Sequence, residues 1–124
     1  MCNRFSKNLQ LGEAAKRNVG TAVNQIPDMS NFSSGSNWFQ LPSGHIVQMF
    51  YFSVNGADAS GSTYSYPIAF PSALIAASAM WIDGGTAAAP TFKIMSGTSS
   101  RNQITIKSSA TSGIYTAQVI AIGR

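Results

Sequence analysis

The stretch HIVQMFYFSV, His45–Val54, decides the fold of this chain. It is rich in β-branched and aromatic residues and follows the turn-forming residues PSG at 42–44, a pattern typical of a β-strand. Side chains alternate across a strand, so the three consecutive aromatic residues at 50–52 cannot all point toward one core. An outward aromatic ring would pack against a second subunit or contact a ligand, unless the local packing of the core accommodates it.

Five further strands are predicted downstream by the same criteria. They cover Tyr64–Tyr66, Leu74–Ile82, Thr91–Met95, Gln103–Lys107 and Ile114–Ile122. Loops rich in glycine, serine and asparagine connect them, at 55–63, 83–91, 96–102 and 108–113. A series of short strands without intervening helices predicts an all-β fold, here an antiparallel β-sandwich over residues 37–124.

Residues 1–36 differ in character from the predicted sandwich. Their only helical pattern is LGEAAKR, Leu11–Arg17, with Gly12 near its start and Gly20 shortly after its end. Isolated helices shorter than ~12 residues are marginal in water, so this one needs a packing partner. We therefore expect an N-terminal stalk or linker segment with a short helix.

Charge is scarce in this sequence. Charged residues make up 10% of the chain and hydrophobic residues 44%, whereas about 25% charged is average. The net charge of +4 comes from basic residues spread along the chain, which argues against a nucleic-acid groove but leaves weak attraction to anionic polysaccharide open. Neither a signal-peptide pattern nor a run of ~20 apolar residues is present, so we expect synthesis in a cytoplasm and no membrane insertion.

The residues that could carry chemistry are few. His45 is the single histidine, Cys2 the single cysteine, and the carboxylates are Glu13, Asp28, Asp58 and Asp83. A glycosidase needs two carboxylates beside one bond, and only the two loop residues Asp58 and Asp83 could supply them. We expect no enzyme activity, no cofactor and no metal cluster, although an ion held on a symmetry axis by one side chain per subunit stays open.

Several motifs, in order, resemble the distal part of bacteriophage and prophage tail fibres. They are Leu9-x-Leu11-Gly12-x-Ala14-Ala15, Val19-Gly20-Thr21, Asn24–Met29 (NQIPDM), Trp38–Gln48 (WFQLPSGHIVQ), Tyr66–Ala73 (YPIAFPSA) and Val119–Gly123 (VIAIG). The resemblance covers nearly the whole chain. It also implies a much longer fibre subunit, of which this chain would be a fragment or an alternative tip cassette.

The resemblance implies a parallel homotrimer at the tip of a virion's tail fibre, assembled with the help of a chaperone. Such a tip binds a host surface receptor, either a glycan such as lipopolysaccharide or an outer-membrane protein; the alternative is a structural trimerisation cap that makes no receptor contact. Family tips share no fixed receptor site, so candidate residues come from the loops and strand ends. They are Asn55, Asp58, Tyr64, Trp81, Asp83 and Arg101.

Overall fold

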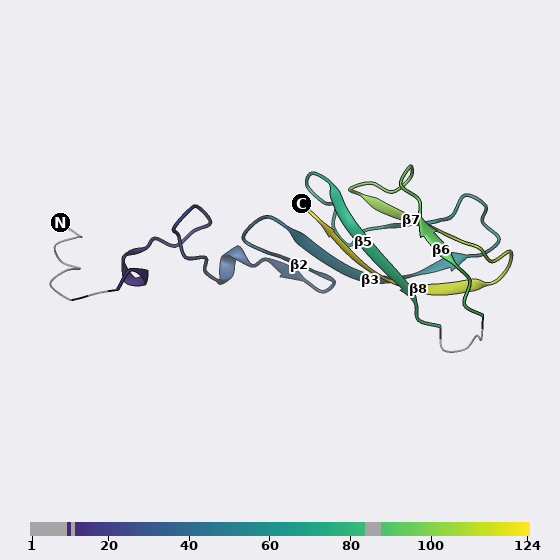
Figure 1. Ribbon diagram of the computed structural model, residues 1–124, viewed down its shortest axis with the longest axis horizontal. Coiled ribbons are helices and arrows are strands. Elements are labelled where there is room, and N and C mark those ends of the chain that lie inside the picture. The colour runs from purple at the N-terminus through teal and green to yellow at the C-terminus, as the bar shows by residue number, and fades with distance from the viewer. Residues whose placement is uncertain (1–9, 11, 84–87) are drawn as a thin grey trace.

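The computed structural model describes residues 10, 12–83 and 88–124. These residues form an extended N-terminal segment followed by two packed antiparallel sheets (Figure 1). The five-stranded sheet has the order β1-β2-β3-β8-β5 and the three-stranded sheet the order β4-β7-β6. The strands are β1 (Ser34–Gly35), β2 (Trp38–Gln40), β3 (Ile46–Asn55), β4 (Ser62–Ser65), β5 (Leu74–Trp81), β6 (Phe92–Ile94), β7 (Gln103–Ser108) and β8 (Ile114–Gly123). The predicted antiparallel all-β fold is confirmed, and each of the six predicted strands is present.

The core lies between the two sheets. β3 and β8 pair over their full lengths and alternate strictly between buried and exposed residues along most of that pairing. Phe50, Phe52, Ile104 and Ile106 are among the buried residues, and the inward faces of β3, β5, β7 and β8 supply most of the core. Burial of such large apolar side chains stabilises a domain by about 1.5–3 kcal/mol each.

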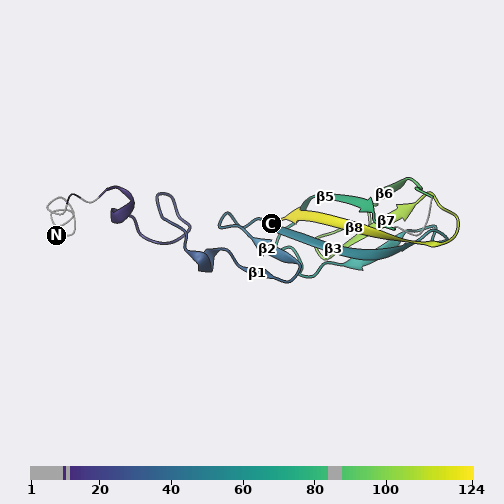
Figure 2. The same cartoon turned by 90° about the horizontal axis from the view of Figure 1, so that it is seen from below.

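The N-terminal segment extends away from the sandwich, and the C-terminus lies near the point where the two join (Figures 1 and 2). We call this end of the sandwich the proximal end and the opposite end the distal end. Because β3 runs from the proximal to the distal end and β8 runs back, the loops at 56–61 and 109–113 meet at the distal end. The connection from β5 to β6 also leaves β5 on the distal side, and its residues 84–87 lie outside the described part.

The predicted helix at Leu11–Arg17 is reduced to one 3-10 turn, Ala14–Lys16. Its first residues lack a side-chain cap and none of its residues is buried, so neither capping nor packing supports a longer helix. Leu11 itself, like Leu9 and Cys2, lies outside the described residues. A second 3-10 turn, Met29–Asn31, is capped by Asp28, whose carboxylate accepts hydrogen bonds from the Ser30 hydroxyl and backbone that hold its pKa below the usual range.

The five-stranded sheet extends beyond the strands predicted by periodicity. β1 pairs with β2, and β2 pairs with β3, so the sheet includes residues 34 and 35 of the region predicted as stalk. No helix in the described part of the chain is long and apolar enough to cross a membrane.

Candidate functional site

Most outward side chains in the proximal half of the five-stranded sheet are apolar, whereas Ser53, Ser78, Thr116 and Gln118 are polar outward positions of the same sheet. In the strand register, Phe39, Val47 and Ile122 form one row across β2, β3 and β8, and Met49 and Ile120 form the next. Most of these side chains are at least a third exposed; Ile120 is 48% exposed. We call this surface the apolar face, and it comprises Phe39, Val47, Met49, Tyr51, Ala76, Met80, Ile120 and Ile122.

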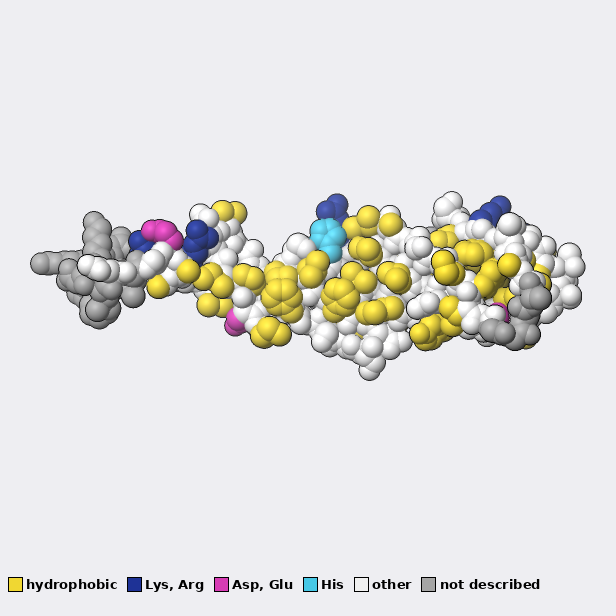
Figure 3. Space-filling view, turned by 60° about the horizontal axis from the view of Figure 1, so that its bottom comes forward, with side chains coloured by type: hydrophobic (Ala, Val, Ile, Leu, Met, Phe, Trp, Pro, Cys, Tyr) yellow, Lys and Arg dark blue, Asp and Glu magenta, His cyan; other side chains and the backbone are white. Residues whose placement is uncertain are grey.

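The apolar face continues into the N-terminal segment. Val19, Val23, Met29 and Phe32 of that segment are all more than 40% exposed. Figure 3 shows hydrophobic side chains from the N-terminal segment onto the middle of the domain. Soluble monomers rarely expose contiguous apolar surface of this kind, so the band has the character of an association surface.

The outward side chains of the three-stranded sheet are polar instead. They are Thr63, Ser65, Lys93, Gln103 and Lys107, from all three strands. Thr105 points the same way but is only 1% exposed, so it is not part of the accessible surface. The hydroxyls of Thr63 and Thr105 share a hydrogen bond of 2.7 Å, and the Gln103 amide donates to the Thr98 carbonyl at 3.0 Å. We call this surface the polar face. The two faces lie on opposite sides of the sandwich, so the molecule separates an apolar surface from a hydrophilic one.

Two of the predicted site residues lie at the last position of β3 and in the distal loop at 56–61, where they stabilise the loop itself. The Asn55 carboxamide oxygen accepts a hydrogen bond from the Ala57 backbone at 3.0 Å. The Asp58 carboxylate accepts from both the backbone and the hydroxyl of Ser60, at 3.1 and 2.9 Å. This loop is tied to its neighbour by the backbone bond from Gly56 to Gly113. Both side chains thus have a local structural role, with oxygen lone pairs still open to a ligand.

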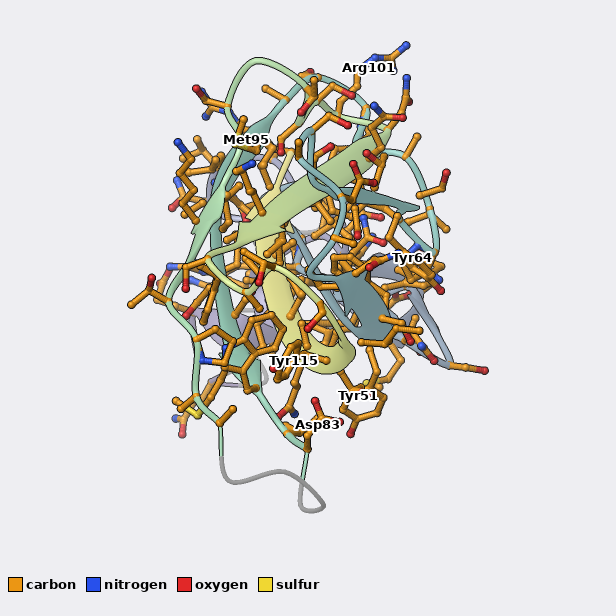
Figure 4. All side chains as sticks on the ribbon, turned by 90° about the vertical axis from the view of Figure 1, so that its right-hand side faces the viewer. Tyr51, Tyr64, Asp83, Met95, Arg101 and Tyr115 are labelled. Carbon is orange, nitrogen blue, oxygen red and sulfur yellow. The ribbon has the colours of Figure 1, made fainter. Side chains whose placement is uncertain are left out.

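Trp81 and Asp83 anchor the distal end of β5. The Trp81 indole donates to the Pro90 carbonyl at 2.7 Å, and its ring packs against Phe92 and Tyr115 at centroid distances of 4.9 and 5.4 Å. The Asp83 carboxylate accepts from the Thr116 backbone at 2.5 Å. Figure 4 looks onto this end and shows Asp83 with Tyr115 near it. Trp81 and Asp83 therefore lie on the same side of the distal end.

Tyr64 and Arg101 lie away from these distal residues. Tyr64 points toward the interior, where its ring stacks on Phe50 and Phe52 at 5.1 and 5.4 Å, and it remains 38% exposed. Arg101 lies near the proximal end, with its guanidinium 3.4 Å from the carbonyl oxygens of Phe70 and Pro71. It also lines a groove of about 690 Å³ beside the start of β5. The six residues therefore do not form a single site.

His45 has a contact that resembles part of a catalytic arrangement. Its Nδ1 lies 2.9 Å from the Ser43 hydroxyl, in the exposed turn before β3. Within the described residues no carboxylate pairs with this histidine, and no group of three or more histidine, cysteine, aspartate or glutamate side chains could hold a metal ion. A serine–histidine contact alone does not supply the orienting third group that an activated nucleophile needs.

Lys93 and Lys107 were not among the predicted site residues. They are direct partners in the β6–β7 ladder and both point outward on the polar face. Hollows of about 260 and 300 Å³ lie beside Lys107. The alternation in FKI and QITIK could have shown that both lysines are opposite to the core side chains, but the register that pairs them is not visible in the sequence.

The antiparallel sandwich carries an apolar face that continues into an extended N-terminal segment, which is an arrangement suited to association between chains. The comparison with protein families identifies the class, because residues 40–124 match the family described as "Putative tail fiber protein gp53-like, C-terminal". This match covers more than half of the chain, and the chain belongs to this family of tail fibre C-terminal domains. A comparison with curated proteins finds no match.

Solved structures of similar fold come from pyocin fibres. The C-terminal part of the R2 pyocin fibre of P. aeruginosa has a TM-score of 0.61 and 16% identity, over 75% of this chain and 25% of that chain. An N-truncated R1-type pyocin tail fibre has a TM-score of 0.51 and 27% identity, over 75% of this chain and 84% of that chain. The chain thus spans about a quarter of the R2 structure, and the likeness to R2 shows the fold alone.

Proposed function

We propose that this domain is the receptor-binding tip of a homotrimeric tail fibre, which attaches a virion to a glycan or an outer-membrane protein of a host bacterium. The observation that carries the proposal is the separation of an apolar face from a polar face on the two sides of one sandwich. The apolar face suits association between copies of the chain. The polar face and the distal loops suit contact with a hydrated surface.

The course of the apolar band supports the parallel association that the tail fibre resemblance implies. The band runs from the N-terminal segment onto the proximal half of the five-stranded sheet, so copies that lie side by side in the same direction would bury it along its whole length. Arranged around an axis, the copies would turn their polar faces outward. Three is the number of subunits that the tail fibre resemblance implies. An assembly chaperone, which the same resemblance implies, would have to cover this band before the copies meet.

A receptor contact at the tip would gain strength from repetition. Three equivalent sites per tip allow weak single contacts to add up to stable attachment. The distal loops, with Asn55, Asp58 and the Trp81–Asp83 region, would face the host surface, while Arg101 lies at the other end. We also infer that the domain binds without catalysis, since Asp58 is anchored within its own loop and Asp83 on the Thr116 backbone, with no contact between the two carboxylates that would mark a catalytic pair in the described residues.

The test of association is the mass in solution measured by light scattering. We expect about three times 13.1 kDa for the wild type and 13.1 kDa for Ile120→Glu, because a carboxylate in an apolar interface costs several kcal/mol. The matched control is Ser65→Glu, which places the same charge on the exposed polar face. A wild-type monomer would contradict the trimer, and equal dissociation of the two variants would contradict the burial of the apolar face within it.

The test of receptor binding is adsorption of the purified protein to a panel of Gram-negative strains that includes P. aeruginosa. We expect the trimer to adsorb to some strains. The monomeric Ile120→Glu variant should adsorb much more weakly, because it no longer presents three linked binding sites. A trimer that adsorbs to no strain would favour the alternative, a structural cap that closes the fibre. The apolar face is compatible with that alternative as well, so adsorption decides between them.

A further inference from the structure

The polar face contains an uncompensated pair of like charges. Lys93 and Lys107 are direct cross-strand partners, a geometry that is destabilising when both side chains carry the same charge. Within the described residues neither lysine forms an ion pair, because the single ion pair found there joins Glu13 and Lys16 in the N-terminal segment. An anion between the two ammonium groups would relieve the repulsion.

Both acidic side chains of the sandwich accept hydrogen bonds from the backbone. Asp58 accepts hydrogen bonds within its own loop, and Asp83 accepts one from the Thr116 backbone. In a chain with only four acidic residues, no other carboxylate of the sandwich remains to neutralise the lysines. Asp58 lines the hollow of about 300 Å³ beside Lys107 but forms no ion pair with it, so a bound anion would add the counter-charge that the fold leaves incomplete.

The surface between the lysines is hollowed. A hollow of about 260 Å³ is lined by Thr91, Phe92, Lys93, Lys107, Ser108 and Ser109. A second, of about 300 Å³, lies on the other side of Lys107 against the distal loop. The ammonium of Lys107 donates a hydrogen bond to the Ala59 carbonyl, which holds the side chain between the two hollows. Both volumes lie near the lower limit of small-molecule sites, roughly 300 Å³, and suit a single sugar unit.

We propose that this hollow is a subsite for an anionic sugar, in which Lys93 and Lys107 bind a carboxylate or phosphate group. The proposal rests on the receptor-binding function proposed above and names the class of glycan. Ammonium–anion hydrogen bonds are stronger than neutral ones. The hydroxyls of Thr91 and Ser109 line the same hollow and can bond sugar hydroxyls, and the methylene stems of the lysines offer apolar surface to the ring. The hollow lies on the polar face, which the proposed trimer leaves accessible.

The experiment is a titration of the full chain with three probes that share one ring, followed by amide chemical shifts in NMR. The probes are galacturonate, galactose 6-phosphate and the neutral parent galactose. We expect one or both anions to shift the amides of residues 91–93 and 107–109, and galactose to leave them unchanged. Which anion acts distinguishes a carboxylate from a phosphate source. Absence of any shift with both anions, or an equal shift with galactose, overturns the proposal.

The variants separate a specific site from general attraction to a basic protein. Lys93→Gln should weaken anion binding about five- to tenfold, and Lys93→Arg should retain most of it. The matched control is Arg124→Gln, which removes the same charge from an exposed residue at the proximal end. Equal weakening by Arg124→Gln would mean that net charge alone attracts the anion, which overturns the subsite. Circular dichroism and light scattering confirm that each variant is folded and associated as the wild type is.

Adsorption to the strain panel distinguishes a failure of the receptor-binding proposal from a failure of the anionic-sugar subsite. If the wild type adsorbs and Lys93→Gln adsorbs equally well, receptor binding stands and the assignment of this subsite fails. If the wild type binds the anionic probes at residues 91–93 but adsorbs to no strain, the subsite stands and the receptor-binding tip fails.

Discussion

Gln48 provides the sharpest test of how the two sheets are joined. Its side chain is fully buried, and it forms two hydrogen bonds with the backbone of Ile68, which lies in the segment from β4 to β5. The amide nitrogen donates to the Ile68 carbonyl at 2.7 Å, and the amide oxygen accepts from the Ile68 N–H at 3.0 Å. One side chain thus fixes the crossover between the sheets.

The change Gln48→Met keeps the volume but removes both bonds. Each buried polar group left without a partner costs about 1–3 kcal/mol. Ile68 is only half-buried and water can reach its backbone in part, so we expect a total loss of about 2–4 kcal/mol in the free energy of unfolding. The control is Gln103→Met, which removes one bond at a half-buried position and should cost about 1 kcal/mol or less.

The change Gln48→Glu adds a dependence on pH with a definite sign. An ionised carboxylate can accept from the Ile68 N–H but faces the Ile68 carbonyl without a proton to donate, and burial raises its pKa. The protonated carboxyl restores both bonds. The stabilisation is therefore fully present below the unfolded pKa of about 4.3 and is lost as pH rises through the higher folded pKa. The natural chain has only four acidic side chains, so few other groups make the free energy of unfolding depend on pH in this range.

Urea denaturation followed by tryptophan fluorescence at pH 4 and pH 7 measures these differences. Protein concentration is held constant, because association would add a concentration-dependent term. At pH 7 we expect Gln48→Glu to be less stable than Gln48→Met, and at pH 4 more stable. A Glu variant that gains nothing on acidification relative to the Met variant would refute the reasoning, as would a Met variant no worse than Gln103→Met.

Two further predictions concern the core and a turn. Burial raises the pKa of Tyr66 to about 12, and its hydroxyl has no hydrogen-bond partner in the described structure, so wild-type stability should fall as pH rises from about 10 to 12. Tyr66→Phe should lose that part of the decline and gain about 1 kcal/mol at pH 7; an unchanged decline in alkaline urea titrations would contradict this. Gly61→Ala should cost about 1–3 kcal/mol, because φ is +91° and the new Cβ would lie 2.9 Å from a Thr105 methyl group. Gly97→Ala, where a Cβ meets open space, should cost little in the same urea assay.

The strands were predictable because their signal is local. The alternation in QITIK placed Ile104 and Ile106 on one face, and the structure buries both. The aromatic triplet at 50–52 also obeys the period of two, with Phe50 and Phe52 buried and Tyr51 61% exposed. The order of the strands in the sheets was not predictable. β3 pairs with β8, a strand almost sixty residues downstream, and neither strand sequence specifies which other strand it pairs with.

The candidate site was harder to predict from the sequence than the strands were. The reason is that the hydrogen-bond partners of loop residues and the register of the strands are not visible in the sequence. Asn55 and Asp58 were selected as polar loop residues, but the same residue types also stabilise turns, and in this loop they do. Arg101 was selected on the same grounds and lies at the proximal end, because β6 and β7 turn back there. The Lys93–Lys107 pair exists only in the register of two strands whose separation in sequence conceals it.

The scarcity of charged residues in this chain makes the Lys93–Lys107 pair informative. In an average domain, a quarter of the residues are charged and an unpaired lysine carries little information. Here the sandwich has two carboxylates, and both bind backbone amides at the distal end. Charge on the remaining surface is therefore positive wherever it occurs, and Lys93 and Lys107 concentrate it beside two hollows on the face that association would leave free. Lys107 donates a hydrogen bond to the Ala59 carbonyl, but within the described residues no ion pair neutralises either lysine, so an anion bound beside the pair would relieve the repulsion between them.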